Sequence, residues 1–411
     1  MPIIGIIAEY NPFHQGHLYH LRTIQKELSP QGIICVLGGN FLQRGEPALV
    51  NKWARCAMAL QQGIDLVFEL PVLYATRSAY WFARGGIETL TSTGITTHLA
   101  FGVETKQNIL LKKAAAYLAS EPKAYQQKLQ NLLKQGLSYP QARTQALPPE
   151  FLPILQSPNN ILGLTYLQII QELDLNLIPF ILKRKGSDYL NKDFNKLYPS
   201  ASAIRHHLIS PPLNFIEKLQ TLKNSLPLET ITILAQEFSQ GRAPIYFKQL
   251  NTQLMTLLRR STPEKLKQII EITEGLENRI YRLAHQTTDI QEFLKKLKTK
   301  RFTYTRLQRF LIHLLLDYTK EAELCLEKGP PYLRLLGFTD RGQKLLRQIK
   351  LKGTLPIISR GAQIDHHLKK HPEIFPFWEK DVLATNLYTL LYPNPMTRTA
   401  NLDYQLPPVN V

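Results

Sequence analysis

Cysteine is scarce in this sequence of 411 residues, which holds only Cys35, Cys56 and Cys325. The three lie too far apart for a Cys-x-x-Cys pair or another familiar metal or redox spacing. This excludes a small fold built on disulfides and a cysteine zinc site. We expect the protein to work in a reducing compartment, the cytoplasm.

Long apolar runs are missing as well. No stretch reaches the roughly 18 uninterrupted apolar residues of a membrane-spanning helix. The first apolar segment has no basic residues before it and ends at Glu9. We therefore expect neither a signal peptide nor a membrane anchor. Nothing in the sequence points to an obligate protein partner.

Acidic residues are too few to balance the basic ones. The chain has 32 Asp and Glu against 50 Lys and Arg, a formal net charge of +18. Residues 241–320 carry 16 basic and 7 acidic side chains, so half of the excess lies in about a fifth of the chain. Such an excess attracts polyanions, although a merely basic protein remains the alternative. Nucleic acid is the predicted partner class.

Segments with strand and helix patterns alternate through the first half of the chain. Strands are predicted at residues 3–8, 32–37, 65–70, 97–102 and 175–182, and helices at 47–62 and 78–92. This alternation is typical of βαβ units. The predicted fold class is α/β, with a doubly wound parallel sheet in a catalytic domain over residues 1–210. A second, mainly α-helical basic domain is expected over residues 211–411.

The opening strand leads into His14-Gln15-Gly16-His17. Asn11-Pro12 interrupts regular structure and a periodic segment follows, so these four residues are predicted at a helix start. Gly16 permits close approach of the backbone, and the unpaired N–H groups of a first helical turn favour an anion. Two histidines three residues apart could both donate to one phosphate. Without such context, a histidine pair is more often surface decoration or a helix cap.

This strand and the His-x-Gly-His string resemble the signature of the nucleotidyltransferase superfamily and of class I aminoacyl-tRNA synthetases. Residues 8–17, followed by Gly39-Asn40-Phe41-Leu42-Gln43-Arg44-Gly45-Glu46-Pro47, resemble a narrower family, the bacterial tRNA(Met) cytidine acetate ligases. The likeness continues at residues 275–280 and 300–309 and so covers most of the chain. It implies an enzyme that uses ATP and acetate to acetylate N4 of the wobble cytidine of elongator tRNA(Met).

The resemblance extends to a second phosphate-binding segment. Residues 200–205, Ser-Ala-Ser-Ala-Ile-Arg, are similar to a signature in which hydroxyl and helix N–H groups surround the β- and γ-phosphates. Arg205 would then neutralise charge on the leaving pyrophosphate, whereas an ordinary capping segment is the alternative. The Lys-Met-Ser-Lys-Ser loop of the synthetases is absent, so the chain is not an ordinary synthetase. The loop at residues 183–187 could serve in its place.

These motifs define the predicted site, to which the family resemblance adds Gly102 and Asn160. The predicted catalytic residues are His14, His17 and Arg205. The predicted ATP-binding residues are Ile7, Ala8, Glu9, Tyr10, Asn11, Pro12, Phe13, His14, Gln15, Gly16, His17, Leu18, Tyr19, His20, Gly102, Asn160, Arg184, Lys185 and Ser202. ATP is expected together with Mg²⁺, and no protein metal site is predicted: His367 and His371 are four residues apart, but Lys369 and Lys370 between them oppose a cation.

A basic stretch in the second half suggests where RNA would bind. Residues 295–309 hold seven basic side chains, no acidic ones, and the aromatic residues Phe302 and Tyr304. Such a mixture suits an RNA loop, although a solvated helix and turn is the alternative. The predicted RNA-binding residues are Arg44, Lys298, Lys300, Arg301, Arg306 and Arg309, with elongator tRNA(Met) and acetate as partners.

Two other functions remain open on the sequence alone. One is a nucleotidyltransferase that makes a small nucleotide cofactor. The other is a tRNA-binding protein that holds ATP without turning it over. Release of pyrophosphate from ATP and acetate would separate them from the ligase.

Overall fold

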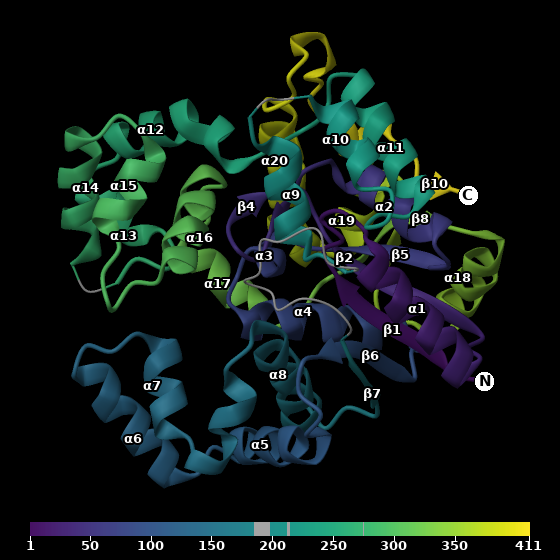
Figure 1. The fold of residues 1–411 in the computed structure, drawn as a ribbon, viewed down its shortest axis with the longest axis horizontal. Coiled ribbons are helices and arrows are strands. Elements are labelled where there is room, and N and C mark those ends of the chain that lie inside the picture. Colours follow the sequence, from purple (N-terminus) through teal and green to yellow (C-terminus); the bar gives the residue numbers. More distant parts are fainter. Residues whose placement is uncertain (185–197, 212–213, 274) are drawn as a thin grey trace.

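The computed structural model describes residues 1–184, 198–211, 214–273 and 275–411 of the chain (Figure 1). A central sheet runs through the molecule, and helices pack on both of its faces. None of the helices in these ranges is long and apolar enough to cross a membrane.

Five parallel strands make up the main part of the sheet, in the order β5-β2-β1-β6-β7. They are β1 (Ile3–Ala8), β2 (Gly32–Gly38), β5 (Leu66–Leu70), β6 (His98–Val103) and β7 (Ile178–Lys183). The chain therefore starts in the middle of the sheet, builds outward to one side, and returns to build the other. This is a doubly wound arrangement, and the predicted fold class is confirmed.

The remaining strands come from the second half of the chain. The strand β8 (Leu333–Phe338) pairs antiparallel with β5, and β9 (Ile357–Ile358) and β10 (Val409–Asn410) pair in parallel with β8. The expected division at residue 210 therefore does not separate sheet from helices. The sequence of β8, Leu-Arg-Leu-Leu-Gly-Phe, contains no β-branched residue. Pairing with the edge of β5 makes it a strand despite weak strand propensity.

Alternating side chains send the strands' apolar residues to two faces. Ile3, Ile34 and Phe68 belong to one core, which includes residues of α4 (Ala79–Thr91) and α8 (Pro158–Glu172). Ile4, Ile33 and Val67 belong to the other, which includes residues of α1 (Gln15–Leu28) and α2 (Lys52–Gln61). Burial on both faces holds the sheet rigid, so the ends of its strands are fixed positions for side chains.

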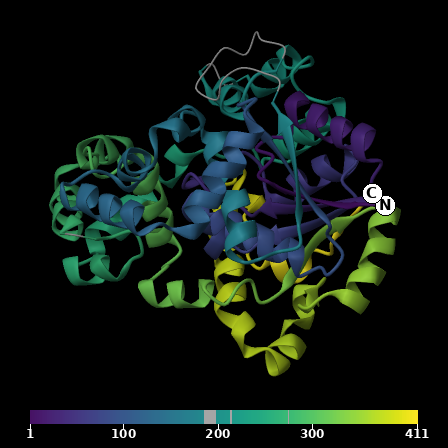
Figure 2. The same cartoon turned by 90° about the horizontal axis from the view of Figure 1, so that it is seen from below.

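Two groups of helices project from the same side of the sheet, one above the other in Figure 1 and both at the left in Figure 2. The first, which we call the arm, comprises α5 (Asn108–Ser120), α6 (Lys123–Lys134) and α7 (Tyr139–Ala146). The second, the helical module, packs around a core that also includes Phe41, Val72 and Tyr388 from other segments. It comprises α12 (Asn251–Arg260), α13 (Pro263–Gln268), α14 (Leu276–Gln286), α15 (Ile290–Leu297) and α16 (Tyr304–Leu315).

The other helices complete the two layers. They are α3 (Val72–Ala75), α9 (Ala201–Ile209), α10 (Phe215–Thr221), α11 (Leu228–Ser239), α17 (Lys320–Leu326), α18 (Asp340–Lys352), α19 (Ile364–Lys370), α20 (Phe375–Thr389) and α21 (Leu402–Gln405). The helix predicted at residues 47–62 begins only at Lys52. Asn51 caps it by accepting the N–H of Ala54. Pro47 instead belongs to a short hairpin of β3 (Phe41–Leu42) and β4 (Glu46–Pro47).

Candidate active site

A large cleft opens where β1 and β6 separate. Six residue pairs join β1 to β2, but only Ile4–His98 and Gly5–Leu99 join β1 to β6. The two strands therefore diverge toward their carboxyl ends, at the point where the strand order of the sheet reverses. Ligands bind in such crevices in open α/β sheets. The cleft measures about 1660 Å³ and reaches from the strand ends to the helical module and the arm.

Most of the predicted ATP-binding residues line this cleft. They are Ile7, Ala8, Glu9, Tyr10, Asn11, His14, Gly16, His17, Tyr19, His20, Gly102 and Arg184. Pro12, Gln15, Asn160 and Ser202 are not among the lining residues, and Phe13 and Leu18 lie in the core beneath α1. Lys185 lies outside the described residues.

His14 and His17 are positioned by the first turn of α1. His14 is the N-cap residue, and its Nδ1 accepts the backbone N–H of Gly16 at 3.0 Å. His17 Nδ1 accepts the backbone N–H of His14 at 3.2 Å, which completes a capping box. The two rings stack with centroids 3.7 Å apart. Because each Nδ1 is an acceptor, a neutral ring carries its proton on Nε2. Each histidine can thus donate one hydrogen bond from Nε2.

The surroundings keep both rings neutral. Burial and the nearby positive charge of Arg184 lower the pKa of His14 to about 3. Burial, together with His14 itself, holds the pKa of His17 well below its usual value. Burial and the positive charge of Arg184 lower the pKa of His20 to about 4. The histidines therefore offer an anion hydrogen bonds rather than positive charge, and the N–H groups of the helix start add to these.

Arg205 brings a guanidinium group to the loop that follows β1. It projects from α9, and its Nη1 donates to the carbonyl oxygen of Asn11 at 2.9 Å. Its Nη2 contacts Glu46 Oε1 of the β3–β4 hairpin at 2.6 Å. All three residues line the cleft. Arg205 of the segment at residues 200–205 thus contacts the loop that carries the His-x-Gly-His string, although more than 180 residues separate the two segments in the chain.

A buried arginine that the sequence analysis overlooked fixes the strand ends. Arg55 of α2 is fully buried, and its Nη1 donates to the carbonyl oxygens of Glu9 at 2.7 Å and Gly38 at 2.8 Å. Its Nη2 donates to the carbonyl oxygen of Gly39. Arg55 therefore joins the residues that follow β1 to those that follow β2. An arginine inside a predicted amphipathic helix gives no sign of such a role.

Asn160 occupies a different place from the one predicted. It is buried, and its Oδ1 accepts the backbone N–H groups of Glu104 and Thr105 at 2.9 and 3.1 Å. It thus fixes the loop after β6, while its neighbour Asn159 lines the cleft. Gly102 lines the cleft as predicted, and a Cβ there would lie 2.9 Å from Cγ of Arg184.

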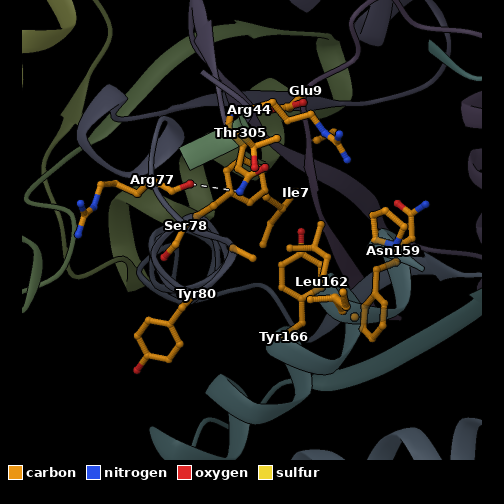
Figure 3. A pocket seen from close by; sticks show the side chains of 18 of the residues that line it. Ile7, Glu9, Arg44, Arg77, Ser78, Tyr80, Asn159, Leu162, Tyr166 and Thr305 are labelled. Atoms are coloured by element: carbon orange, nitrogen blue, oxygen red, sulfur yellow. Dashed lines mark hydrogen bonds between the residues drawn. The ribbon is translucent and has the colours of Figure 1, made fainter. Parts of the chain in front are cut away.

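Figure 3 shows further lining residues, with Ile7, Leu162 and Tyr166 facing the cleft from β1 and α8. Glu9 and Arg44 lie along its upper edge (Figure 3). Glu9 Oε1 accepts the backbone N–H of Gln43 at 2.8 Å, and burial raises the pKa of this carboxyl group. The part of the wall at Ile7, Leu162 and Tyr166 is therefore largely apolar, and the part at Glu9 and Arg44 is polar.

The predicted RNA-binding residues divide into two groups. Arg44, Arg301, Arg306 and Arg309 line the cleft, whereas Lys298 and Lys300 are exposed outside it. Glu271 pairs with Arg306 at 3.2 Å and with Arg309 at 3.0 Å. Phe302 is buried in the core of the helical module and cannot stack on a base. Its expected place on an exposed RNA-binding surface is therefore wrong. Tyr304 is exposed.

No cluster of three or more His, Cys, Asp or Glu side chains that could hold a metal ion occurs within the described ranges. His371 lies beside Glu373, with His371 Nδ1 3.2 Å from its carboxylate. Carboxylates do border the cleft, among them Glu9, Glu46 and Glu104. A cation bound there would therefore take most of its ligands from a bound molecule and from water.

Comparison with known proteins gives consistent results. The family described as HIGH Nucleotidyl Transferase matches residues 1–403. A tRNA(Met) cytidine acetate ligase of Syntrophomonas wolfei is 41% identical over 419 aligned residues, which cover 100% of this chain and 99% of that protein. The tRNA(Met) cytidine acetate ligase of Thermoanaerobacter sp. strain X514 is 41% identical, with 98% of each chain covered.

Solved structures are also similar to this chain over its full length. The apo crystal structure of Thermotoga maritima TmcAL has a TM-score of 0.95 to this chain at 33% sequence identity, with both chains fully covered. The crystal structure of the same protein bound with alpha-thio ATP has a TM-score of 0.93, again at 33% identity and with full coverage of both chains.

Proposed function

This chain belongs to the HIGH nucleotidyl transferases and, among them, to the family of the tRNA(Met) cytidine acetate ligases, and we propose that it catalyses the reaction for which those relatives are named. It would activate acetate with ATP as acetyl-adenylate and transfer the acetyl group to N4 of the wobble cytidine of elongator tRNA(Met). We place this reaction in the cytoplasm, where tRNA is modified and free thiols such as Cys35 and Cys56 remain reduced.

One observation supports the ATP site above all others: two neutral imidazoles at a helix N-terminus line the cleft, and each has Nε2 left as its donor. Nδ1 of both His14 and His17 is engaged with backbone N–H groups. Since the rings are neutral, they bind phosphate oxygens by hydrogen bonds and leave the charge compensation to arginine. Arg205 and Arg184, both in the cleft lining, can supply it.

The other end of the cleft suits the nucleoside. Ile7, Leu162 and Tyr166 offer an apolar surface for a base, and Gly102, which also lines the cleft, leaves room for the side chain of Arg184 beside it. Asn160 would act on the nucleotide indirectly, by fixing the loop at residues 104–105. We propose His14, His17 and Arg205 as catalytic residues on this basis.

The proposed chemistry proceeds in two steps and needs no protein nucleophile. An acetate oxygen attacks the α-phosphorus, the bond to the bridging oxygen of pyrophosphate breaks, and acetyl-adenylate forms. The cytidine N4 amine then attacks the acetyl carbon, the bond from carbon to AMP breaks, and N4 loses a proton. Catalysis would rest on positioning and on donors aimed at developing negative charge.

Mg²⁺ fits this site only as a companion of the nucleotide. It prefers octahedral oxygen ligands and commonly binds to one or two carboxylates together with substrate phosphates and water. Glu9, Glu46 and Glu104 are the carboxylates closest to that description, since all three line the cleft. The ion would neutralise charge on the triphosphate, while the residues of this chain orient it.

The helical module is proposed as the main tRNA-binding region. Arg301, Arg306 and Arg309 line the same cleft as the ATP site, so RNA bound there could present a cytidine to the adenylate. Lys298 and Lys300 extend this basic surface outside the cleft. Acetate is the proposed acyl donor.

Pyrophosphate release tests this function directly. Purified protein incubated with ATP, acetate and Mg²⁺ should release pyrophosphate, and addition of elongator tRNA(Met) should yield N4-acetylcytidine detectable by mass analysis of nucleosides. A nucleotidyltransferase would release pyrophosphate without acetate, given a phosphate-bearing acceptor. A protein that only holds ATP would release none, and either result would refute the ligase.

A further inference from the structure

The arm carries a concentration of positive charge outside the region so far assigned to RNA. Residues 106–146 hold six lysines and one arginine against a single acidic residue, Glu121. All six lysines are exposed: Lys106, Lys112, Lys113, Lys123, Lys128 and Lys134. Within the described residues, no ion pair includes any of them. Their charge is therefore not compensated locally.

The arm also forms one wall of the active-site cleft. Ser138, Tyr139, Pro140 and Arg143, at the start of α7 and along it, line the cleft together with residues of α16. Arg143 Nη2 donates to Gln168 Oε1 of α8 at 2.9 Å, which anchors α7 to the sheet layer. Tyr139 is 55% exposed. An exposed ring on a wall of the cleft is a stacking surface.

The geometry of the substrate explains why a second wall would be needed. A nucleotide whose base enters the cleft has a phosphate on each side, and the chain leaves the cleft in two directions. Residues of the helical module line one part of the cleft. The arm, on the same side of the sheet in Figures 1 and 2, faces the cleft from the other wall.

We propose that the arm is a second RNA-binding surface, on which Tyr139 stacks on an unpaired base and the lysines of α6 contact phosphates of the same loop. This inference rests on the proposed function, because it takes a single-stranded tRNA loop as the ligand. Recognition of single strands by exposed aromatic rings among basic side chains is general. The arm adds the wall opposite to α16.

The charge contribution is tested by replacing Lys123, Lys128 and Lys134 with Gln in the full-length protein. Each lost phosphate contact should reduce the slope of log K against log salt by about 0.7 for single-stranded RNA, so the slope should fall by about 2. Affinity for elongator tRNA(Met) at 0.1 M salt should fall by about a hundredfold if all three contact phosphate. The control replaces Lys344, Lys350 and Lys352, three exposed lysines of α18, which lies at the opposite end of the molecule (Figures 1 and 2).

Stacking is tested separately at Tyr139. Tyr139→Ala should weaken tRNA binding by about tenfold, and Tyr139→Phe should restore it, because stacking needs only the ring. Phe375→Ala is the control, since Phe375 on α20 is 54% exposed and lies outside the cleft lining. Pyrophosphate release from ATP and acetate without tRNA should be unchanged in the variant of Lys123, Lys128 and Lys134 and in both controls.

The outcomes separate this inference from the function on which it rests. If the unaltered protein neither releases pyrophosphate nor binds tRNA, the proposed function fails. If it does both, but the α6 and Tyr139 variants bind tRNA like the α18 and Phe375 controls, the arm has no role in RNA binding and this inference alone is overturned.

Discussion

Replacement of His14 by Asn separates the two tasks that the structure gives to one imidazole. Nδ1 of His14 caps α1 by accepting the N–H of Gly16, and Nε2 is left to donate toward the cleft. Asn is among the best N-cap residues, so its side-chain oxygen should take over the first task. It is too short to reproduce the second. Alanine removes both.

Loss of each task should have a different cost, one in reaction rate and one in stability. Loss of one donor to developing negative charge typically costs about a hundredfold to a thousandfold in rate. Loss of a cap costs about 1 kcal/mol of stability. His14→Asn and His14→Ala should therefore lose acetate-dependent pyrophosphate release to a similar degree, while only His14→Ala should unfold at a lower denaturant concentration.

The assay is single-turnover pyrophosphate release at saturating ATP and acetate, with urea unfolding of each variant measured alongside. If His14→Asn released pyrophosphate at close to the original rate, the Nε2 donor would be unnecessary and the assigned role of His14 would be refuted. Equal loss of stability in both variants would refute the capping role.

Three further predictions concern stability and binding. Burial lowers the pKa of His14 to about 3 and of His20 to about 4, whereas the unfolded chain takes up these protons near pH 6.5. The free energy of unfolding should therefore fall as the pH is lowered from about 6.5 toward these folded-state values. The unfolding temperature of His14→Asn should depend less steeply on pH than that of the original protein. An equal dependence on pH in both proteins would contradict the burial of a neutral ring. Lys52→Met should lower the free energy of unfolding, measured in urea, by about 3–5 kcal/mol, because it leaves the buried carboxylates of Glu69 and Asp403 without their cation. Both carboxylates lie 2.7 Å from Lys52 Nζ. A loss below about 1 kcal/mol would show that charge does not hold this network together. Gly45→Ala should destabilise the chain by about 1–3 kcal/mol and weaken tRNA binding. The reason is that φ of Gly45 is +75° and that the added Cβ would lie 2.4 Å from the backbone nitrogen of Arg309. Unaltered unfolding and tRNA affinity would mean that the hairpin and α16 are not packed as described.

The parts of the account that the sequence could predict are those encoded locally. The apolar run, the break at Asn11-Pro12 and the His-x-Gly-His string are contiguous, and the structure has the strand, loop and helix start that they indicate. Their meaning as a site follows from the doubly wound sheet, which the alternation of strands and helices also predicted. The family resemblance added the substrate.

The remaining features depend on contacts between distant segments. Nothing near Glu46 indicates that it pairs with Arg205, 159 residues away. The side-chain amide of Asn160 could equally have faced the cleft or the loop at residues 104–105, and only the fold decides between them. The basic neighbours of Phe302 suggested that it belongs to an exposed RNA-binding stretch, but its side chain is buried in the core of the helical module. The strand β8 exists because β5 offers it an edge.

A crystal structure of this protein with a non-hydrolysable ATP analogue is the most direct test of the central claim, that a triphosphate binds where β1 meets α1. The account predicts phosphate oxygens within hydrogen-bond distance of Nε2 of both His14 and His17, with the adenosine between Gly102 and the apolar wall of α8. A nucleotide bound elsewhere, or phosphates out of reach of both rings, would contradict it.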